Sequence, residues 1–500
     1  MTLAPSNAMG RPAPRILRLV FSFPAMLASL LVVLAVLTVR SRFDDPDMWW
    51  HLKMGEIVWT THTIPTTDIF SFTTHHHAWI PHEWLSQVVI YLAYQKGGYS
   101  GLMLWLCFFA SAIFIAGYGL CTFYSGNAKV SFLGVLVIFV FATVGLSVRP
   151  QMIGYFLLIV ELLLIHLGRT RNPRWFWGLP PLFALWINCH GSVSLGFILA
   201  GIFLFCSFFH FRMGSLISER WEPRNRKTFI WVLILSAAAL FLNPVGVRQV
   251  LYPIDTLLHQ PLGLSAVQEW QPLQLSSQRG VLFLALLGSS FLLVIVRNSE
   301  LYFDEFLMLA LGIWLAGSHD RMLFVFGILA APIFSRMLST SWEGYNPETD
   351  RIGLNAVLIG TALLIAFLVF PGAKNLATQA EKNSPVKAVD FIKTHHLSGP
   401  MLNDYTDGGY LIWAMPEHPV FVDGRGDVYE WTGVLQEFGN WATLQVNPNT
   451  LLDKYGIQFC LVESGSSIAN VLPLMQNWKS VYSDDNSVIF VRIPGPNSAP

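Results

Sequence analysis

Long apolar runs alternate along the chain with short stretches that carry Gly, Pro and charge. A helix that crosses the hydrocarbon core of a bilayer needs about 20 apolar residues, and most of the runs approach this length. The runs are 16–39, 101–124, 130–147, 152–168, 175–189, 192–211, 228–243, 281–297, 303–317, 321–336 and 352–371. The pattern predicts an α-helical polytopic membrane protein with about eleven transmembrane helices over residues 16–371.

Residues 372–500, after the last run, follow a different pattern in which short apolar stretches alternate with turn residues. Ser384 and Pro385 are typical of an N-cap and a first helical position, which predicts a helix over 385–396. The other expected elements are strands over 400–404, 419–423, 457–463 and 487–493, with a hairpin turn at Asp484-Asp485-Asn486. We therefore expect a soluble α/β domain after the membrane-spanning segment.

The positive charges of the chain predict its orientation. Residues 1–15 carry Arg ahead of the first apolar run, so the positive-inside rule places the N-terminus in the cytoplasm. Counting spans from there places the basic loops that begin at Arg169 and Arg212 on the same side. The polar loop over 41–84 and the domain over 372–500 then lie together on the outer, periplasmic face.

The first long polar loop, residues 41–84, is rich in acids, histidines and tryptophans. Asp45-Pro46 is typical of a helix start, which predicts a helix over 46–60. A second start at Pro81 opens an amphipathic segment that ends at Gly97-Gly98. At about 15 residues this segment is short for a span, so we expect two interfacial helices with tryptophans at headgroup depth.

Composition supports the membrane assignment and excludes some functions. The chain is 53% hydrophobic and 12% charged, whereas charged residues make up about a quarter of ordinary soluble domains. Lys plus Arg and Asp plus Glu number 31 each, so no net basic field favours nucleic-acid binding. The five cysteines are scattered without metal-site spacing, and we interpret them as small core residues.

Acids of the first loop have the chemistry of a divalent-cation site. Hard cations such as Mg or Mn bind a few carboxylates and keep several of their waters. Asp45, Asp47 and Glu83 are the candidate ligands. The histidine triplet over 75–77 is a weaker candidate, because three adjacent side chains cannot all face one ion on a regular element.

Short motifs spread over nearly the whole chain carry a resemblance to a known family. They are Asp45–Leu52, Gly55, Pro65, Asp68, Phe70–Thr73, Trp79, His82–Leu85, Asn188–Gly191, Asn243-Pro244, Glu269-Trp270, His319–Arg321, Gly408–Trp413 and Asp423–Arg425. With these motifs the chain resembles a bacterial multi-pass group of the C-type glycosyltransferase (GT-C) superfamily. That superfamily includes protein O-mannosyltransferases, oligosaccharyltransferases and lipid A aminoarabinose transferases.

The resemblance implies transfer of a sugar from a polyprenyl-phosphate carrier to a lipid, glycan or protein acceptor. The reaction is expected at the outer face of the bacterial cytoplasmic membrane, with a first-loop carboxylate as base or metal ligand. That role falls on Asp45 or Asp47. Such chemistry needs an acid of this kind, because an acceptor hydroxyl or amide is a poor nucleophile until a carboxylate takes or orients its proton.

A departing lipid phosphate carries negative charge that a cation must meet. Arg149 and Arg321 lie at the outer ends of apolar runs and are our candidates for binding the donor phosphate, although an Arg there also serves as a snorkelling anchor. His190 and His319 are further candidates, or else interface histidines. The candidate supporting residues are His51, His82, Glu83 and Glu269.

Two other functions remain open from the sequence. A transporter or flippase of a lipid-linked sugar would use the same residues for binding only, and charges inside the spans would favour it. We interpret the charged residues as lying at span ends, which speaks against it. A non-catalytic envelope-assembly protein would use the first loop and the C-terminal domain to dock partners.

Overall fold

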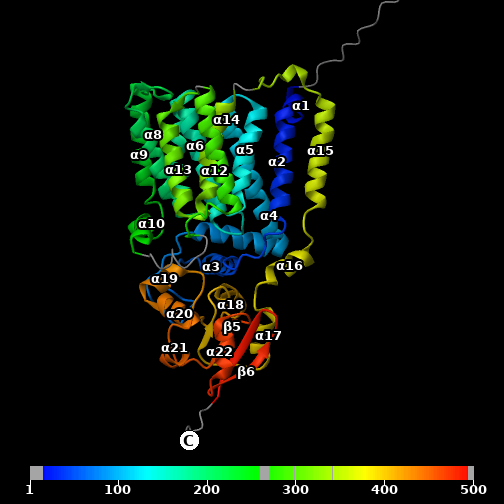
Figure 1. Cartoon of the computed structure of the whole chain (residues 1–500), viewed down its shortest axis with the longest axis vertical. Helices are drawn as coiled ribbons and strands as arrows, with labels where there is room; N and C mark the ends of the chain where they lie inside the picture. The colour runs from blue at the N-terminus through cyan, green and yellow to red at the C-terminus, as the bar shows by residue number, and fades with distance from the viewer. Residues whose placement is uncertain (1–14, 260–269, 298, 340–341, 494–500) are drawn as a thin grey trace, which may run out of the picture.

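The computed structural model describes residues 15–259, 270–297, 299–339 and 342–493. Helices form an upright bundle, and a small mixed domain lies beyond one end of it (Figure 1). The bundle and its connections comprise α1 (Arg15–Val20), α2 (Phe23–Val39), α3 (Met48–Thr61), α4 (Trp84–Ser125), α5 (Ala128–Ala142), α6 (Gln151–Thr170), η1 (Pro173–Gly178), α7 (Leu179–Ile187), α8 (Val193–Cys206), β1 (Phe211–Met213), β2 (Leu216–Ser218), α9 (Pro223–Ala239), α10 (Val247–His259), α12 (Gln278–Arg297), β3 (Leu301–Tyr302), α13 (Phe303–Ser318), η3 (Asp320–Met322), α14 (Leu323–Leu338), η5 (Pro347–Thr349), α15 (Ile352–Leu368) and α16 (Ala373–Glu381).

The chain is a mostly helical, multi-span membrane protein. Among the described residues, four helices are long and apolar enough to cross a bilayer: Trp84–Ser125, Gln151–Thr170, Gln278–Arg297 and Asp320–Leu338. A fifth candidate is the pair α15 and α16, which is bent by 55°. Each apolar run of the sequence contains at least one helix, but several are shorter than a full span. The count of about eleven crossings stays a prediction.

A break at Gly98 divides α4 into two helices. Gly98 has φ 55° and ψ −142°, inside an otherwise helical stretch. The part before the break lies across the base of the bundle next to α3, and the part after it rises into the bundle (Figure 1). The two predicted first-loop helices are therefore present, although α3 begins at Met48, two residues later than expected.

The C-terminal domain combines short helices with one mixed sheet. Its elements are α17 (Val386–Thr394), β4 (Met401–Asn403), α18 (Gly408–Ala414), α19 (Gly426–Trp431), α20 (Val434–Ala442), α21 (Pro448–Lys454), β5 (Phe459–Glu463), α22 (Ser467–Val471), η6 (Leu472–Leu474), β6 (Trp478–Ser483) and β7 (Ser487–Arg492). The sheet order is β4-β5-β7-β6, with β4 parallel to β5 and the other two pairs antiparallel. The predicted hairpin turn joins β6 to β7.

Two local predictions in this domain are wrong. The segment 419–423 is no regular strand, because only Val420 forms a bridge, to Ser71 of the first loop. Ser384 does not cap α17, since its hydroxyl donates to the carbonyl oxygen of Ala380. Val420 pairs with a residue distant in the chain instead of with a neighbouring strand. Ser384 bonds to the segment before it instead of to the helix that follows it.

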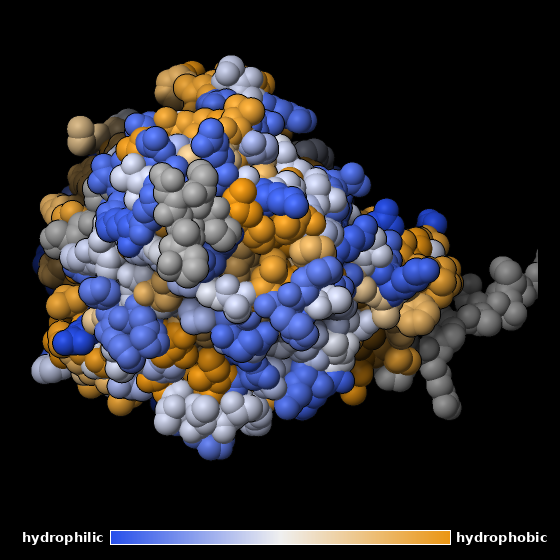
Figure 2. All heavy atoms as spheres, turned by 90° about the horizontal axis from the view of Figure 1, so that it is seen from below, coloured by the Kyte–Doolittle hydropathy of each residue, from blue (hydrophilic) through white to orange (hydrophobic). Residues whose placement is uncertain are grey.

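The first loop and the C-terminal domain share one hydrophobic core. Trp50, Phe70 and Trp79 of the loop pack in the same cluster as Phe421 and Tyr429 of the domain. Burial of such rings removes large apolar areas from water, which stabilises the contact. The predicted headgroup position is therefore wrong for Trp50 and Trp79, which are buried inside protein. The opposite face of the domain is covered mostly by hydrophilic residues, with hydrophobic residues in small groups (Figure 2).

Candidate active site

Arg149 joins the two acids that the sequence analysis singles out. Its Nε donates to Oδ2 of Asp45 at 2.6 Å, and its second guanidinium nitrogen lies 3.1 Å from Oδ2 of Asp47. Asp45 Oδ1 also accepts from the backbone N–H of Asp47, just before α3 begins at Met48. Asp45 thus supports the helix start and holds Arg149 at the same time. The structure brings three predicted site residues together from segments about a hundred positions apart in sequence.

A second cluster surrounds Glu83, whose side chain is 11% exposed. Glu83 Oε1 lies 3.3 Å from Nε2 of His190 and 3.7 Å from Nε2 of His82, and Oε2 lies 4.0 Å from Nδ1 of His51. His51 comes from α3, His82 precedes α4 and His190 lies between α7 and α8. Helix ends from three parts of the bundle therefore converge on one carboxyl group.

Burial sets the protonation of this second cluster. It raises the pKa of Glu83 to about 8, although the charges of Arg321 and Arg149 oppose the shift. Burial lowers the pKa of His82 to about 4 and holds the pKa of His51 and of His190 well below the ordinary value. At neutral pH the cluster therefore consists of a protonated carboxyl group among neutral imidazoles. In this state the cluster carries no charge, so the gain or loss of one proton leaves a single buried charge.

Arg321 lies near the same cluster, and its charge contributes to the pKa of Glu83 and His190. Its guanidinium binds Oε1 of Gln151 and lies 5.6 Å from the ring centroid of Trp270. His319 is placed differently: its Nδ1 donates to the carbonyl oxygen of Trp270 at 2.7 Å. His319 thus fixes the segment that carries Trp270. Glu269 lies outside the described residues.

The C-terminal domain approaches this region closely. A side chain at Gly424 would collide with Oδ1 of Asp47, and one at Gly409 would lie 2.6 Å from the carbonyl oxygen of Pro46. Glycine is the residue that permits such an approach of one backbone to another segment. The domain therefore forms one wall of the candidate site.

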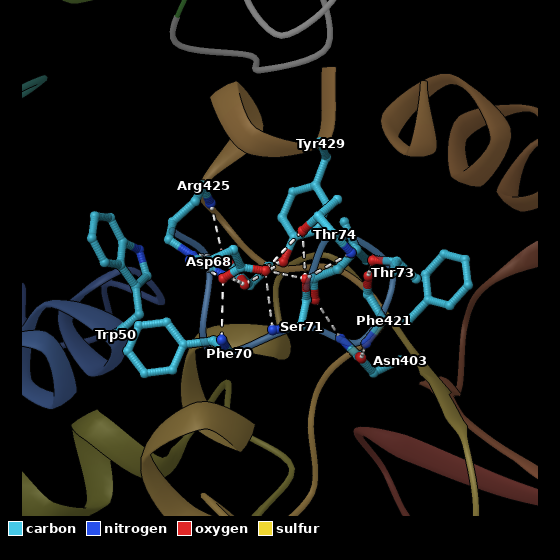
Figure 3. A network of polar contacts seen from close by, with 12 residues as sticks. Trp50, Asp68, Phe70, Ser71, Thr73, Thr74, Asn403, Phe421, Arg425 and Tyr429 are labelled. Atoms are coloured by element: carbon cyan, nitrogen blue, oxygen red, sulfur yellow. Dashed lines mark hydrogen bonds and ion pairs between the residues drawn. The ribbon is translucent and has the colours of Figure 1, made fainter. Parts of the chain in front are cut away.

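A buried ionic network fastens the domain to the first loop (Figure 3). Arg425 donates to Oδ1 of Asp68 at 2.6 Å and, through two nitrogens, to both oxygens of Asp423 at 2.8 and 2.6 Å. Tyr429 also donates to Asp423. Burial would raise the pKa of Asp68, but Arg425 and the hydroxyl of Ser71 lower it below its usual range. Asp423 and Arg425, which belong to one short motif of the sequence, form an ion pair, and Asp68 joins them from a distant segment that the sequence did not indicate.

The candidate metal ligands do not form a cation site. Asp45 and Asp47 both bind Arg149, and Glu83 is surrounded by histidines and carries a raised pKa. Over residues 15–259, 270–297, 299–339 and 342–493, no group of three or more His, Cys, Asp or Glu is arranged to hold an ion. We therefore assign no step of any reaction to a metal.

Glu161 was missed by the sequence analysis. It lies in the middle of α6, fully buried, and neither carboxyl oxygen has a hydrogen-bond partner in the described part of the chain. The interpretation that charged residues lie only at span ends is therefore wrong. A single Glu in an apolar run was the available signal, because a charge inside a span is costly and is a functional-site hypothesis by default.

Comparison with known proteins shows the fold. No family model matches the chain, and no curated protein matches its sequence. The archaeal oligosaccharyltransferase AglB from Archaeoglobus fulgidus, in complex with an inhibitory peptide and a dolichol-phosphate, gives a TM-score of 0.50 and 13% identity, covering 95% of this chain and 75% of that one. ArnT from Cupriavidus metallidurans, bound to undecaprenyl phosphate, gives 0.49 and 13%, covering 94% and 98%. The Archaeoglobus enzyme with Zn and sulfate gives 0.46 and 13%, covering 93% and 73%. Over nearly its whole length the chain is similar in fold to GT-C glycosyltransferases.

Proposed function

We propose that this protein is a membrane glycosyltransferase. It moves a sugar from a polyprenyl-phosphate carrier to a lipid, glycan or protein acceptor at the outer face of the bacterial cytoplasmic membrane. The observation that carries the proposal is the pairing of Arg149 with both Asp45 and Asp47, in a chain with a GT-C-like fold. A carboxylate base and a cation for a leaving phosphate are the two groups that such a transfer needs.

The two acids have different proposed roles. The side chain of Asp47 is 22% exposed and that of Asp45 is 9% exposed, so Asp47 is the better placed to meet an acceptor. Asp47 takes the proton of the acceptor hydroxyl or amide as that group bonds to the anomeric carbon of the sugar. The bond from that carbon to the phosphate oxygen breaks, and the lipid phosphate leaves with the electron pair. Arg149 and Arg321 meet its negative charge, while Asp45 holds Arg149 in place.

The test is transfer of a labelled sugar from synthetic polyprenyl-phosphate donors by the purified protein. We expect Asp47→Asn to lower kcat by at least about 10²-fold, the scale of general-base removal, with unchanged binding of the donor. Asp45→Asn should act mainly on donor binding, because it releases Arg149. Asp453→Asn is the matched control, since Asp453 forms an exposed ion pair with Arg492. Full activity in both first-loop variants would contradict the proposal.

Glu161 favours a second candidate function, transport of a lipid-linked sugar. A carboxyl group buried in mid-span with no partner among the described residues is typical of a proton or substrate pathway. The two functions separate in proteoliposomes that contain a fluorescent lipid-linked sugar. Movement of the lipid without sugar transfer by the wild type, abolished in Glu161→Gln, would support the transporter. Sugar transfer that persists in Glu161→Gln would support the transferase.

A further inference from the structure

Tyr252 of α10 connects the C-terminal domain to the Glu83 cluster. Its ring stacks on the imidazole of His82, with centroids 4.0 Å apart and the planes inclined by 26°. Its hydroxyl donates to Oδ2 of Asp427, in the first turn of α19, at 3.1 Å. His82 in turn lies 3.7 Å from Glu83. A continuous chain of contacts therefore runs from the C-terminal domain to the carboxyl group at the centre of the cluster.

The same helix holds His82 at a second point. Gln249, one turn before Tyr252, is buried, and its side-chain amide donates to the carbonyl oxygens of His82 and Ile187 at 3.2 and 2.6 Å. α10 thus fixes the backbone of His82 through Gln249 and the ring of His82 through Tyr252. A stacked pair of this kind constrains the plane of the imidazole as well as its position.

Asp427 supplies the fixed point for Tyr252. Burial raises the pKa of Asp427 to about 6, so the carboxylate remains mostly charged at neutral pH and needs hydrogen bonds. The bond from Tyr252 meets that need and prevents the phenol from rotating about the stack. Because Asp427 belongs to the C-terminal domain, the orientation of Tyr252 depends on how that domain is seated.

We propose that Tyr252 and Asp427 are positioning residues: the seated C-terminal domain orients Tyr252 through Asp427, and Tyr252 holds His82 beside Glu83. The expected effect on kcat rests on the proposed glycosyl transfer. The expected effect on the position of His82 does not depend on that function. Displacing a supporting group by about 1 Å can cost on the order of 10²-fold in rate, so the effect is measurable.

Conservative and disruptive substitutions at each position separate the contacts. Asp427→Asn keeps an acceptor for the phenol, so it should lower kcat less than about fivefold. Tyr252→Phe keeps the ring on His82 but loses the bond to Asp427, so its loss of kcat should match that of Asp427→Ala. Asp427→Ala and Tyr252→Leu should each lower kcat by about 10- to 100-fold with little change in the KM of the donor. Equal losses in Asp427→Asn and Asp427→Ala would overturn the proposal. Asp453→Asn, which removes an acid from an exposed ion pair of the same domain, should leave kcat unchanged.

A readout that needs no turnover distinguishes failure of this proposal from failure of the proposed function. In ¹⁵N-histidine-labelled protein, the His82 imidazole signal is identified by its loss in His82→Ala. We expect it to shift and broaden in Tyr252→Leu and Asp427→Ala, while the His319 signal stays in place because Trp270 holds that ring. An unchanged His82 signal in both variants would overturn the proposal. A shifted signal in a protein whose wild type transfers no sugar would support it and contradict the glycosyltransferase assignment alone.

Discussion

Arg425 carries a buried positive charge that Asp68 and Asp423 neutralise, with both side-chain partners fully buried. Removing one member of such a group leaves the others as uncompensated charges in a medium that solvates them poorly. We expect Arg425→Leu to lower the free energy of unfolding by about 3–5 kcal/mol, measured by thermal or denaturant unfolding in detergent.

The matched control for Arg425 is Lys454→Ala. Lys454 also forms a short ion pair, with Glu437, but that pair is exposed to solvent. Exposed pairs contribute about 0–1 kcal/mol, so the control should unfold almost as the wild type does. Equal destabilisation by the two substitutions would show that burial of Arg425 has no energetic consequence.

At the scale of single residues, the chemical role of a side chain was easier to predict from the sequence than the residue that it binds. Asp45-Pro46 and Pro81 mark helix starts that can be recognised from neighbouring residues alone. The site residues next to these starts could therefore be predicted from the sequence. Asp68 and Arg425 are 357 positions apart, and no local pattern links them. Arg149 was expected to meet a phosphate, and its pairing with Asp45 depends on the fold of the bundle. Partners of this kind follow from tertiary contacts alone.

At the scale of elements, Gly98 determines the shape of α4. Its φ of 55° with ψ of −142° lies in a region that essentially only glycine occupies. Gly97, its neighbour, has no positive φ, and a Cβ at either position would meet no atom within 4 Å. The two glycines therefore differ in backbone conformation and not in available space.

This difference gives a paired prediction. Gly98→Ala should destabilise the protein by more than about 1 kcal/mol, because alanine is strained in that conformation. Gly97→Ala should be neutral or stabilise by up to about 1 kcal/mol, since alanine is the better helix former. Thermal unfolding measures both variants, and hydrogen exchange over residues 84–125 locates the change. A stabilising Gly98→Ala would mean that the break is not required.

Regular elements were predicted where their patterns are local. The strands expected at 400–404, 457–463 and 487–493 correspond to β4, β5 and β7. β6 was missed because it carries Lys479 and polar residues and contains an irregularity between Ser480 and Tyr482, which disturbs the alternation. An edge strand has one unpaired side, so its sequence is less constrained by the core.

At the scale of the whole molecule, pH should act on the C-terminal domain. Burial raises the pKa of Asp407 to about 8 and that of Asp404 to about 6, against about 3.9 in an unfolded chain. At a pH between the unfolded value and the folded value of each pKa, the folded state holds a proton that the unfolded state has released. The free energy of unfolding therefore falls as pH rises through this window, by up to about 1.4 kcal/mol per carboxyl group for each step of one in pH.

The comparison of wild type with Asp407→Asn measures this effect. The wild type should unfold at a lower temperature at about pH 8 than at about pH 5, and this difference should be smaller in Asp407→Asn. Glu83, whose pKa burial also raises to about 8, should still contribute to the difference in that variant. Asp453→Asn, at an exposed position, should retain it. The histidines near Glu83 act in the opposite direction, because their lowered pKa values cost stability as pH falls below about 6.5. An identical pH dependence in wild type and Asp407→Asn would contradict the assignment.

The core shared by residues of the first loop and the C-terminal domain has a consequence for biosynthesis. Trp50, Phe70 and Asp68 are made early, whereas Arg425, which binds Asp68, is made 357 positions later. A nascent chain must therefore keep an apolar and ionised surface exposed while the whole helical bundle is inserted. Chains that terminate before Arg425 should be substrates for chaperones and quality-control proteases, however well their spans have entered the bilayer.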